Sequence, residues 1–394
     1  MTPDSPTRWG VVVLATMAGM MGALQVGKVP PAIPTLRADL ALGLVAAGWV
    51  ASTFNAVSAA LGVAAGTVTD RFGHRRILLA GVLCMAAGSL LGGLAQGQAT
   101  LLGARLLEGL GFVVTVVAAP SIIVAATAQR DHRVALSIWG SYLPAGMALM
   151  MLASPALMSA VGWRGLWLVN AGLLAVFCGV LAVATRNLGA APKRGASLAD
   201  IRMTLARPGP WLLSACFATY TVQFYGLMTW LPTFMAETMG RSTTQAAVLT
   251  AAIIAINVPG NLIGGWLLHR GVPRWRMLAT VSGSLGLLAL GVFSPAVPDD
   301  LKILMAFAFS LIGGALPASV LAGAPVHSPS PAQLGATNGV IVQGSNIGSL
   351  FGPPLVAALV ASLGGWDRSG WILLGSGLAG ILLAVTLRHV ERRL

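Results

Sequence analysis

Long apolar segments separated by short polar loops constrain the fold of this chain more than any other feature of its sequence. Residues 166–185 contain no charged side chain, and residues 9–29 contain only Lys28. A helix of about 20 residues rises 1.5 Å per residue and so crosses the roughly 30 Å of hydrocarbon in a bilayer. A transmembrane barrel needs strands in which apolar and polar residues alternate, and these segments do not alternate. They predict an all-α membrane protein.

The composition supports a surface that faces lipid. Only 9% of the residues are charged and 56% are hydrophobic, whereas a soluble protein has roughly 25% charged residues. The net charge of +13 lies mostly in short loops, so it does not indicate a nucleic-acid partner. The first apolar segment is too long for the core of a cleavable signal peptide, and we expect it to be retained as a helix.

The apolar segments predict twelve transmembrane helices in a multi-pass protein of a bacterial-type inner (plasma) membrane. Lys and Arg are concentrated in every second loop, which places both termini in the cytoplasm. Residues 1–187 and 210–394 hold six spans each, and the basic segment 188–209 is expected to be a cytoplasmic linker. The predicted spans lie near residues 9–29, 44–68, 77–96, 100–127, 134–160, 166–185, 211–235, 244–268, 276–296, 301–326, 334–361 and 369–387.

The two halves resemble each other in sequence. Matching residues recur in the same order about 200 positions apart, and six spans per half give both halves the same orientation in the membrane. Transporters with such parallel repeats bind substrate near the midplane, between the halves. The matching pairs include Trp9 and Trp211, Pro30 and Pro232, Gly66 and Gly265, Arg75 and Arg274, and Pro155 and Pro354.

Two motifs resemble signatures of the major facilitator superfamily. Residues 66–76 read GTVTDRFGHRR, which is similar to the family's loop motif between spans 2 and 3. Residues 101–109 read LLGARLLEG, which is similar to its second motif in span 4. Residues 224–232, FYGLMTWLP, further resemble the cyanate and nitroimidazole transporter-like branch. The resemblance covers the whole chain and implies a fold of two pseudo-symmetric six-helix halves. It also implies a secondary transporter that works by alternating access, rather than an enzyme.

The resemblance also implies a conformational latch in the loop motif. Asp70 would engage the N-terminus of span 11, where a carboxylate is favoured by about 0.3–1 kcal/mol. The second half has His269 in place of this acid, which would make its latch weaker or pH-sensitive. Positive-inside topology accounts equally well for Arg75 and Arg76. The latch residues so predicted are Gly66, Asp70, Arg71, Gly73, Arg75, Arg76, His269 and Arg270.

Charged residues within spans are costly and therefore indicate function. Arg105 and Glu108 lie one helical turn apart and can pair. Glu108 could carry the coupling proton, with its affinity for the proton tuned by Arg105. Alternatively Arg105, with or without Lys28, could hold an anionic substrate. A purely structural ion pair is the third interpretation, and snorkelling to the interface would also explain Lys28.

Polar residues within spans predict a pocket with a few hydrogen-bonding groups on an aromatic and methionine-rich wall. Bonding between helices explains any single one of them equally well. The predicted substrate-binding residues are Gln25, Lys28, Arg105, Tyr142, Tyr220, Gln223, Tyr225, Asn257 and Asn346.

The expected function is alternating-access transport of a small solute, driven by protons. An organic or inorganic anion is favoured because two cations outnumber one acid in the predicted site. The alternatives are a proton-coupled exporter of apolar drugs and a non-transporting receptor. The sequence has no phosphate-binding loop, no cluster with metal-ligand spacing and no catalytic set, so we expect no cofactor, no metal and no enzymatic activity. A monomer is expected.

Overall fold

The computed structural model describes residues 7–61, 72–186, 198–330 and 333–392. Every regular element in these ranges is a helix. The first half comprises α1 (Trp9–Gly27), α2 (Val29–Asp39), α3 (Leu44–Ser52), η1 (Thr53–Asn55), α5 (His74–Gly93), α6 (Gln98–Ala126), η2 (Gln129–Asp131), α7 (His132–Gly140) and α8 (Tyr142–Ala184). The second half comprises α9 (Leu198–Leu205), α10 (Pro208–Met228), α11 (Leu231–Met239), α12 (Thr243–Ala255), α13 (Asn257–His269), α14 (Arg274–Phe293), α15 (Asp299–Gly313), α16 (Ala315–Leu321), α17 (Ala324–His327), α18 (Leu334–Leu363) and α19 (Ser369–Glu391).

These helices match the twelve predicted spans. Ten helical stretches of the described chain are long and apolar enough to cross a membrane. One of them, Val134–Ala184, holds spans 5 and 6, because the chain turns at Gly162 with φ 70°. α10 and α11 together form span 7. The predicted all-α, twelve-span architecture is confirmed, and α9 occupies part of the segment predicted as a linker.

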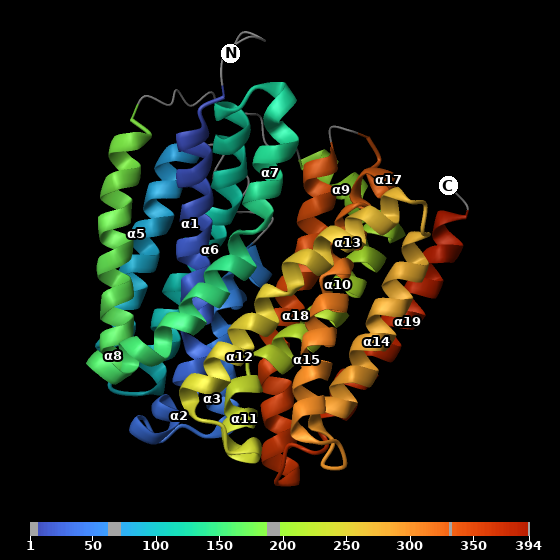
Figure 1. Cartoon of the computed structure of the whole chain (residues 1–394). Coiled ribbons are helices and arrows are strands. Elements are labelled where there is room, and N and C mark those ends of the chain that lie inside the picture. Colours follow the sequence, from blue (N-terminus) through green and yellow to red (C-terminus); the bar gives the residue numbers. More distant parts are fainter. Residues whose placement is uncertain (1–6, 62–71, 187–197, 331–332, 393–394) are drawn as a thin grey trace.

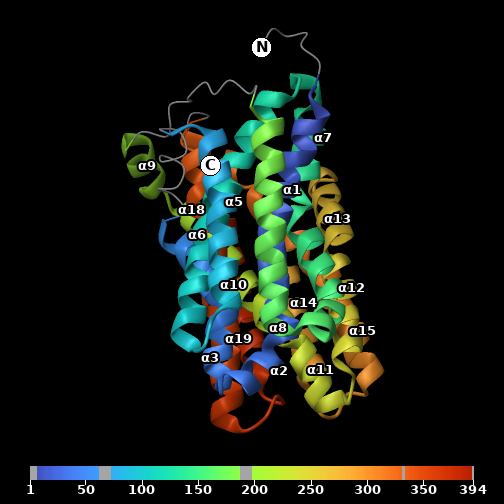
Figure 2. The same ribbon diagram turned by 90° about the vertical axis from the view of Figure 1, so that its left-hand side faces the viewer.

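The helices form two bundles that lie side by side, and both termini are at the same end (Figure 1). The long helices run roughly along one axis, and α9 lies beside the bundle near the end that holds the termini (Figure 2). Within the first half α5 packs on α6 and α8, and within the second α10 packs on α18 while α14 packs on α19. The apolar side chains shared between these helices form the core.

The prolines near the ends of spans 1 and 7 begin a second helical segment. Pro30 and Pro31 occupy the first turn of α2, and Pro232 occupies the first turn of α11. Proline is tolerated there because the N–H groups of a first turn have no partner within the helix. The expectation that span 1 ends near residue 29 is therefore wrong: the chain breaks at Lys28 and continues as a helix to Asp39.

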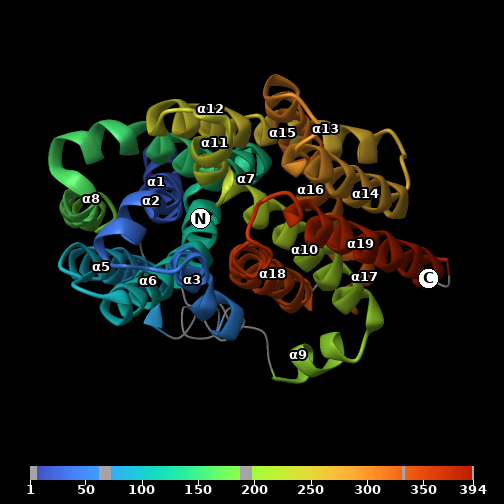
Figure 3. The same cartoon turned by 90° about the horizontal axis from the view of Figure 1, so that it is seen from below.

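The two halves meet at the end of the bundle opposite the termini, which we call the closed end. α2 and α12 contact α11 and α8 respectively, and α3 packs on α18 (Figure 3). Gly48 makes the last contact possible, because a Cβ atom there would lie 3.0 Å from the Cα of Pro354. The rings of Trp49 and Phe351 meet edge to face across the same interface, with centroids 6.0 Å apart.

Candidate functional site

Three charged side chains meet inside the first half. Lys28, Arg105 and Glu108 are all fully buried. Lys28 Nζ lies 2.6 Å from Oε1 of Glu108, and Arg105 Nη1 donates to the other carboxylate oxygen, Oε2. One carboxylate thus bridges two cations, and the group, which we call the charge cluster, carries a net charge of +1 when all three residues are ionised.

Lys28 is held by neutral groups as well as by Glu108. Its ammonium donates to Gln25 Oε1 at 2.6 Å and to Ser89 Oγ at 2.9 Å, and it lies 4.5 Å from the centroid of the Trp167 ring. An ammonium has three donors, and all three are used. The interpretation of Lys28 as a snorkelling interfacial residue is therefore wrong, because the break after α1 points it into the first half.

Arg105 connects three helices through its guanidinium group. Its Nη1 donates to the carbonyl oxygen of Gln25 at 2.9 Å, and its Nε donates to the carbonyl oxygen of Val50 at 3.1 Å. Its guanidinium carbon lies 4.7 Å from the centroid of the Phe54 ring. Nη2 has no hydrogen-bond partner among the described residues. The cluster on α6 is therefore tied directly to the last turn of α1 and to α3.

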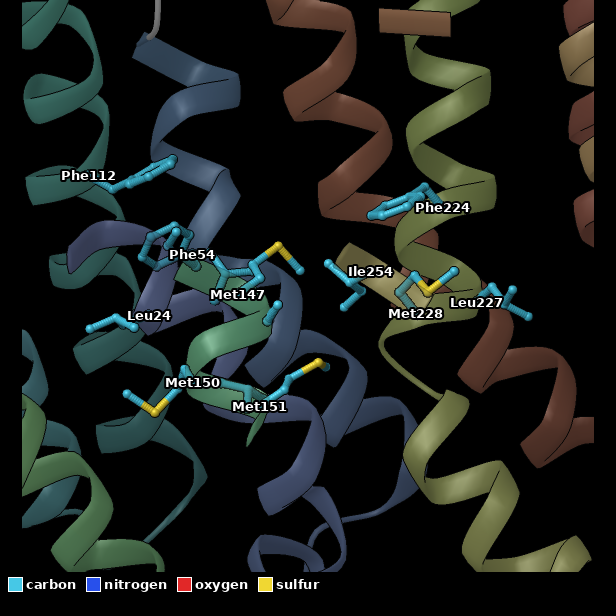
Figure 4. Close-up of a cluster of buried hydrophobic side chains, with 14 of the residues drawn as sticks. Leu24, Phe54, Phe112, Met147, Met150, Met151, Phe224, Leu227, Met228 and Ile254 are labelled. Carbon is cyan, nitrogen blue, oxygen red and sulfur yellow. The ribbon is translucent and has the colours of Figure 1, made fainter. Parts of the chain in front are cut away.

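A separate cavity lies between the halves, at the depth where the helices are interrupted. Methionine side chains from the two halves face this space, Met147 from α8 and Met228 from α10, with Ile254 of α12 beside them (Figure 4). Its walls carry hydroxyl and amide groups but no charge. The residues that line it are Val26, Pro30, Ala51, Asn55, Met147, Tyr225, Met228, Thr229, Ser349 and Pro353.

One of the three tyrosines predicted to bind substrate, Tyr225, lines this cavity. Tyr142 is half-buried on α8, and Tyr220 is buried on α10, where its ring stacks on that of Phe224 at 5.7 Å. Asn257 Nδ2 donates to the hydroxyl of Tyr220 at 3.4 Å and to the carbonyl oxygen of Ser310 at 2.9 Å. The structure thus joins the predicted residues of spans 7 and 8 through Tyr220 and Asn257, and it places Tyr225 at the cavity.

The other predicted substrate residues lie elsewhere. Lys28 and Arg105 belong to the charge cluster, and Gln25 accepts a hydrogen bond from Lys28. All three are fully buried and none of them lines the cavity. Gln223 was expected to contact substrate, but it is buried and donates to the carbonyl oxygens of Ser282 and Leu373. These bonds brace α10 against α14 and α19. Asn346 is half-buried on α18, and its role stays a prediction.

Sequence reasoning missed several polar residues at both sites. Asn55 lines the cavity at the break after α3, about 200 residues before Asn257, which begins α13 after the corresponding break. Asn55 could therefore have been predicted from the internal repeat, as the counterpart of Asn257. Ser89 and Asn170, which bond the charge cluster through Lys28 and Gln25, carried none, because isolated Ser and Asn residues in spans usually bond between helices.

The predicted latch is only partly within the described chain. Gly66, Asp70 and Arg71 lie outside the described residues. Gly73 precedes α5 with φ 88°, a conformation that favours glycine. Arg75 donates to the carbonyl oxygen of Ala182 at 2.8 Å and to Thr185 Oγ1 at 3.1 Å, so it caps the C-terminal end of α8 in the same half. Arg76 is exposed. Arg75 and Arg76 therefore differ in their contacts, although the positive-inside rule explained both equally well.

In the second half, the contact with an acidic residue is made by Arg274 rather than at His269, where the latch was predicted. His269 and Arg270 are exposed, and Arg270 lies over its neighbour Trp266. The acid contact is made by Arg274, which binds the carboxylate of Glu391 and the carbonyl oxygen of Ala322. His327 Nε2 lies 3.1 Å from the same carboxylate. The expectation of a pH-sensitive latch at His269 finds no support in its position.

An ion pair joins the halves at the closed end. Arg37 of α2 lies 3.3 Å from Oε1 of Glu237 on α11, and Trp366 Nε1 donates to Oε2 at 2.9 Å. Trp366 in turn packs in an aromatic group with Phe234 and Phe293. We call the pair Arg37 and Glu237 the gate pair. Among the described residues, no group of three His, Cys, Asp or Glu could hold a metal ion.

Comparisons with known proteins agree with this architecture. Residues 11–342 match the family model described as Major Facilitator Superfamily. The chain is 27% identical over 358 residues to the probable nitrate/nitrite transporter NarK2 of Mycobacterium tuberculosis, covering 88% of this chain and 87% of the relative. It is 27% identical over 402 residues to the cephamycin export protein CmcT of Amycolatopsis lactamdurans, covering 93% of this chain and 81% of the relative. Its fold is similar to the crystal structure of a bacterial homologue of the human lysosomal transporter Spinster in an inward-facing and unoccupied conformation. That TM-score is 0.79 at 17% sequence identity, covering 99% and 96% of the two chains.

Proposed function

Because the chain belongs to the major facilitator superfamily, we propose that it is a secondary transporter of a small solute, coupled to protons through the charge cluster. As a transporter of this family it is not an enzyme. The observation that carries the proposal is the bridging position of Glu108, the only fully buried carboxylate among the described residues.

Protonation of Glu108 would change the forces inside the first half. It removes the one anion that separates two buried cations, so the net charge of the cluster rises from +1 to +2. Uncompensated buried charges are costly, and the two cations then repel each other. Lys28 lies at the break between α1 and α2, and Arg105 holds the carbonyl of Gln25 beside that break. A proton on Glu108 would therefore loosen α2.

The gate pair connects this change to access. Arg37 is on α2, and its partner Glu237 is on the second half. The positive-inside distribution favours a cytoplasmic location for the termini, which makes the closed end the outer face. The proposed cycle opens this face when α2 moves and the gate pair separates.

The identity of the solute is the finer part of the proposal. A small anion is one candidate, because Arg105 Nη2 is a buried donor without a partner among the described residues and the cluster is net positive. An apolar solute moved outward is the other candidate, because the cavity between the halves is uncharged. The relatives include a nitrate/nitrite transporter and a cephamycin exporter, so both candidates have precedent.

Proton movement on addition of a solute tests the proposal. Purified chain would be placed in weakly buffered proteoliposomes loaded with a pH-sensitive dye, and nitrate or 1-naphthol would be added. We expect one probe to drive protein-dependent proton movement that Glu108→Gln abolishes, at a temperature where this variant is folded by size-exclusion chromatography. The matched control is Asp367→Asn, which alters an exposed acid. Proton movement that is unchanged in Glu108→Gln would place coupling elsewhere. Solute flux without proton movement would indicate a uniporter, and binding without flux a receptor.

A further inference from the structure

The ammonium of Lys28 bonds two neutral oxygens besides the carboxylate of Glu108. Gln25 Oε1 on α1 accepts at 2.6 Å, and Ser89 Oγ on α5 accepts at 2.9 Å. Both of these side chains are fully buried. An amide has an oxygen end and a nitrogen end, and a hydroxyl group rotates, so either group could turn a donor toward its neighbour instead. An ammonium only donates, and other contacts must therefore set the orientation of both groups.

Asn170 of α8 fixes the orientation of the Gln25 amide. Asn170 Nδ2 donates to the carbonyl oxygen of Leu166 at 2.8 Å, and because a carbonyl oxygen only accepts, the amide oxygen of Asn170 faces the other way. Gln25 Nε2 donates to this amide oxygen at 3.2 Å and to the carbonyl oxygen of Met21 at 3.1 Å. The remaining atom of the Gln25 amide, its oxygen, is therefore the one that faces Lys28.

The hydroxyl group of Ser89 is oriented by the same helix. Its nearer acceptor is the carbonyl oxygen of Trp167 at 2.9 Å, compared with 3.4 Å to Gln25 Oε1. With its hydrogen directed to Trp167, Ser89 presents a lone pair to Lys28. Trp167 follows Leu166 directly in the chain. Consecutive carbonyl groups of α8 thus orient both neutral acceptors of the ammonium.

Glu108 has few charged neighbours. Within the described residues, the charged groups in contact with its carboxylate are Lys28 and Arg105. Helix α5 packs directly on Glu108 at Gly88, where a Cβ atom would lie 2.8 Å from the Cγ atom of Glu108. The side chains that α5 and α8 add to this network are neutral. A change of charge on Glu108 therefore acts first on these two cations.

A proton on Glu108 has two possible sources. Lys28 Nζ lies 2.6 Å from Glu108 Oε1, and transfer of its proton would give a neutral amine and a neutral carboxyl, with no proton taken from solution. Uptake from solution requires Lys28 to keep its charge while the carboxyl beside it is neutral. The ammonium then depends on its neutral acceptors, because a buried charge without hydrogen-bond partners is costly.

We propose that Asn170 is a positioning residue of the proton site. Through Gln25 it holds a neutral oxygen against Lys28, so that this ammonium keeps its charge while the neighbouring carboxyl is protonated. Ser89 supplies the second neutral oxygen. The inference deepens the proposed coupling through Glu108 and therefore rests on that function. It gives span 6 a part in proton uptake through a neutral side chain and two backbone carbonyl groups.

Infrared difference spectroscopy on the full chain in nanodiscs follows the carboxyl of Glu108 directly. A protonated carboxyl has a C=O stretching band that a carboxylate lacks, and the band that acidification produces in the unchanged chain but not in Glu108→Gln belongs to this residue. We expect Asn170→Leu to need an about 3- to 10-fold higher proton concentration for half of this band, because the protonated state loses an oriented acceptor that no carboxylate replaces. Ser89→Ala should shift the midpoint in the same direction.

Gln223→Leu is the matched control. It removes a buried amide that bonds two carbonyl oxygens in the second half and has no contact with the charge cluster. Its midpoint should equal that of the unchanged chain, at a temperature where every variant is folded by size-exclusion chromatography. An unchanged midpoint in Asn170→Leu and Ser89→Ala, or an equal shift in Gln223→Leu, would overturn the inference. If Asn170→Leu does not fold, Ser89→Ala decides the outcome.

The distance between α2 and α12, measured by electron–electron spin resonance on the same variants, separates this inference from the proposed function. A midpoint that moves in Asn170→Leu while the distance ignores pH would support the positioning role and refute coupling to access. A distance that responds to pH through Glu108, with one midpoint for all variants, would retain the coupling and overturn the positioning role. The absence of any band that Glu108→Gln removes would overturn both.

Discussion

The two halves share a helical plan but place their charges at opposite positions. In the first half the ion pairs of Glu108 are buried between α1 and α6. At the termini end of this half, Arg75 donates to neutral acceptors at the end of α8. In the second half the position of Lys28 is matched by Trp230, which donates to the carbonyl oxygen of Pro353 at 2.9 Å. Its ion pair with both side chains mostly buried lies at the termini end, between Arg274 and Glu391. A repeated helical plan thus carries its buried ion pairs at different places in the two halves.

The largest expected difference between the halves is at the corresponding positions of Lys28 and Trp230. Glu108→Gln should lower the free energy of unfolding by about 3–5 kcal/mol, because two buried cations lose their counterion. Trp230→Phe in the second half should cost only about 0.5–1.5 kcal/mol for one hydrogen bond. Thermal unfolding followed by circular dichroism in detergent measures both. A second substitution, Lys28→Met, should recover part of the loss in Glu108→Gln, and equal losses for Glu108→Gln and Trp230→Phe would contradict the asymmetry.

The termini ends should show the reverse asymmetry. Glu391→Gln leaves Arg274 and His327 without their shared charged acceptor and should cost about 1.5–3 kcal/mol. Thr185→Val in the first half removes one neutral acceptor from Arg75 and should cost about 0.5–1.5 kcal/mol. Unfolding in low and high salt distinguishes them, since only the ion pair should weaken with salt. A salt-independent effect of Glu391→Gln would show that the charge does not matter there.

Two glycines should behave alike if the repeat is structural. Gly73 and Gly271 occupy corresponding turns with φ 88° and 86°. Alanine at either position should cost about 1–2 kcal/mol because the left-handed region is unfavourable for residues with a Cβ atom. Gly265→Ala is the control, since this helical glycine has open space around it. Chemical unfolding measures all three variants, and a tolerated alanine at one turn alone would break the symmetry.

The smallest expected effect concerns the gate pair. Both side chains are partly exposed, so Arg37→Ala should shift the balance between closed and open outer faces by about 0.2–1 kcal/mol, a factor of roughly 1.4–5. Accessibility of a cysteine placed at Ala51 in the cavity to a membrane-impermeant thiol reagent reports the open fraction. Exchanging the charges in Arg37→Glu with Glu237→Arg should restore the balance. If the exchanged pair does not restore the open fraction, packing rather than charge stabilises the contact between α2 and α11.

The fold was predictable because its signals are local and strong. Span length, the loop charges and residues 66–76 and 101–109 are each readable without contacts. The position of Lys28 was not, because the same lysine near a helix end can snorkel or turn inward, and only the helix break decides. Gln223 was misplaced for a similar reason: its depth was readable from the sequence, but the side of α10 on which it lies was not.

The distance across the closed end, measured as a function of pH, reports whether protonation of Glu108 opens that end of the molecule. Spin labels would be placed at the exposed positions Ala38 on α2 and Thr244 on α12, with Cys84, Cys178 and Cys216 replaced by alanine. Double electron–electron resonance in nanodiscs then reports how far the halves separate there. We expect acidification to lengthen this distance in the otherwise unchanged chain, and we expect Glu108→Gln to remove the response to pH. A response that is identical in Glu108→Gln, or no response in either chain, would contradict coupling through the charge cluster.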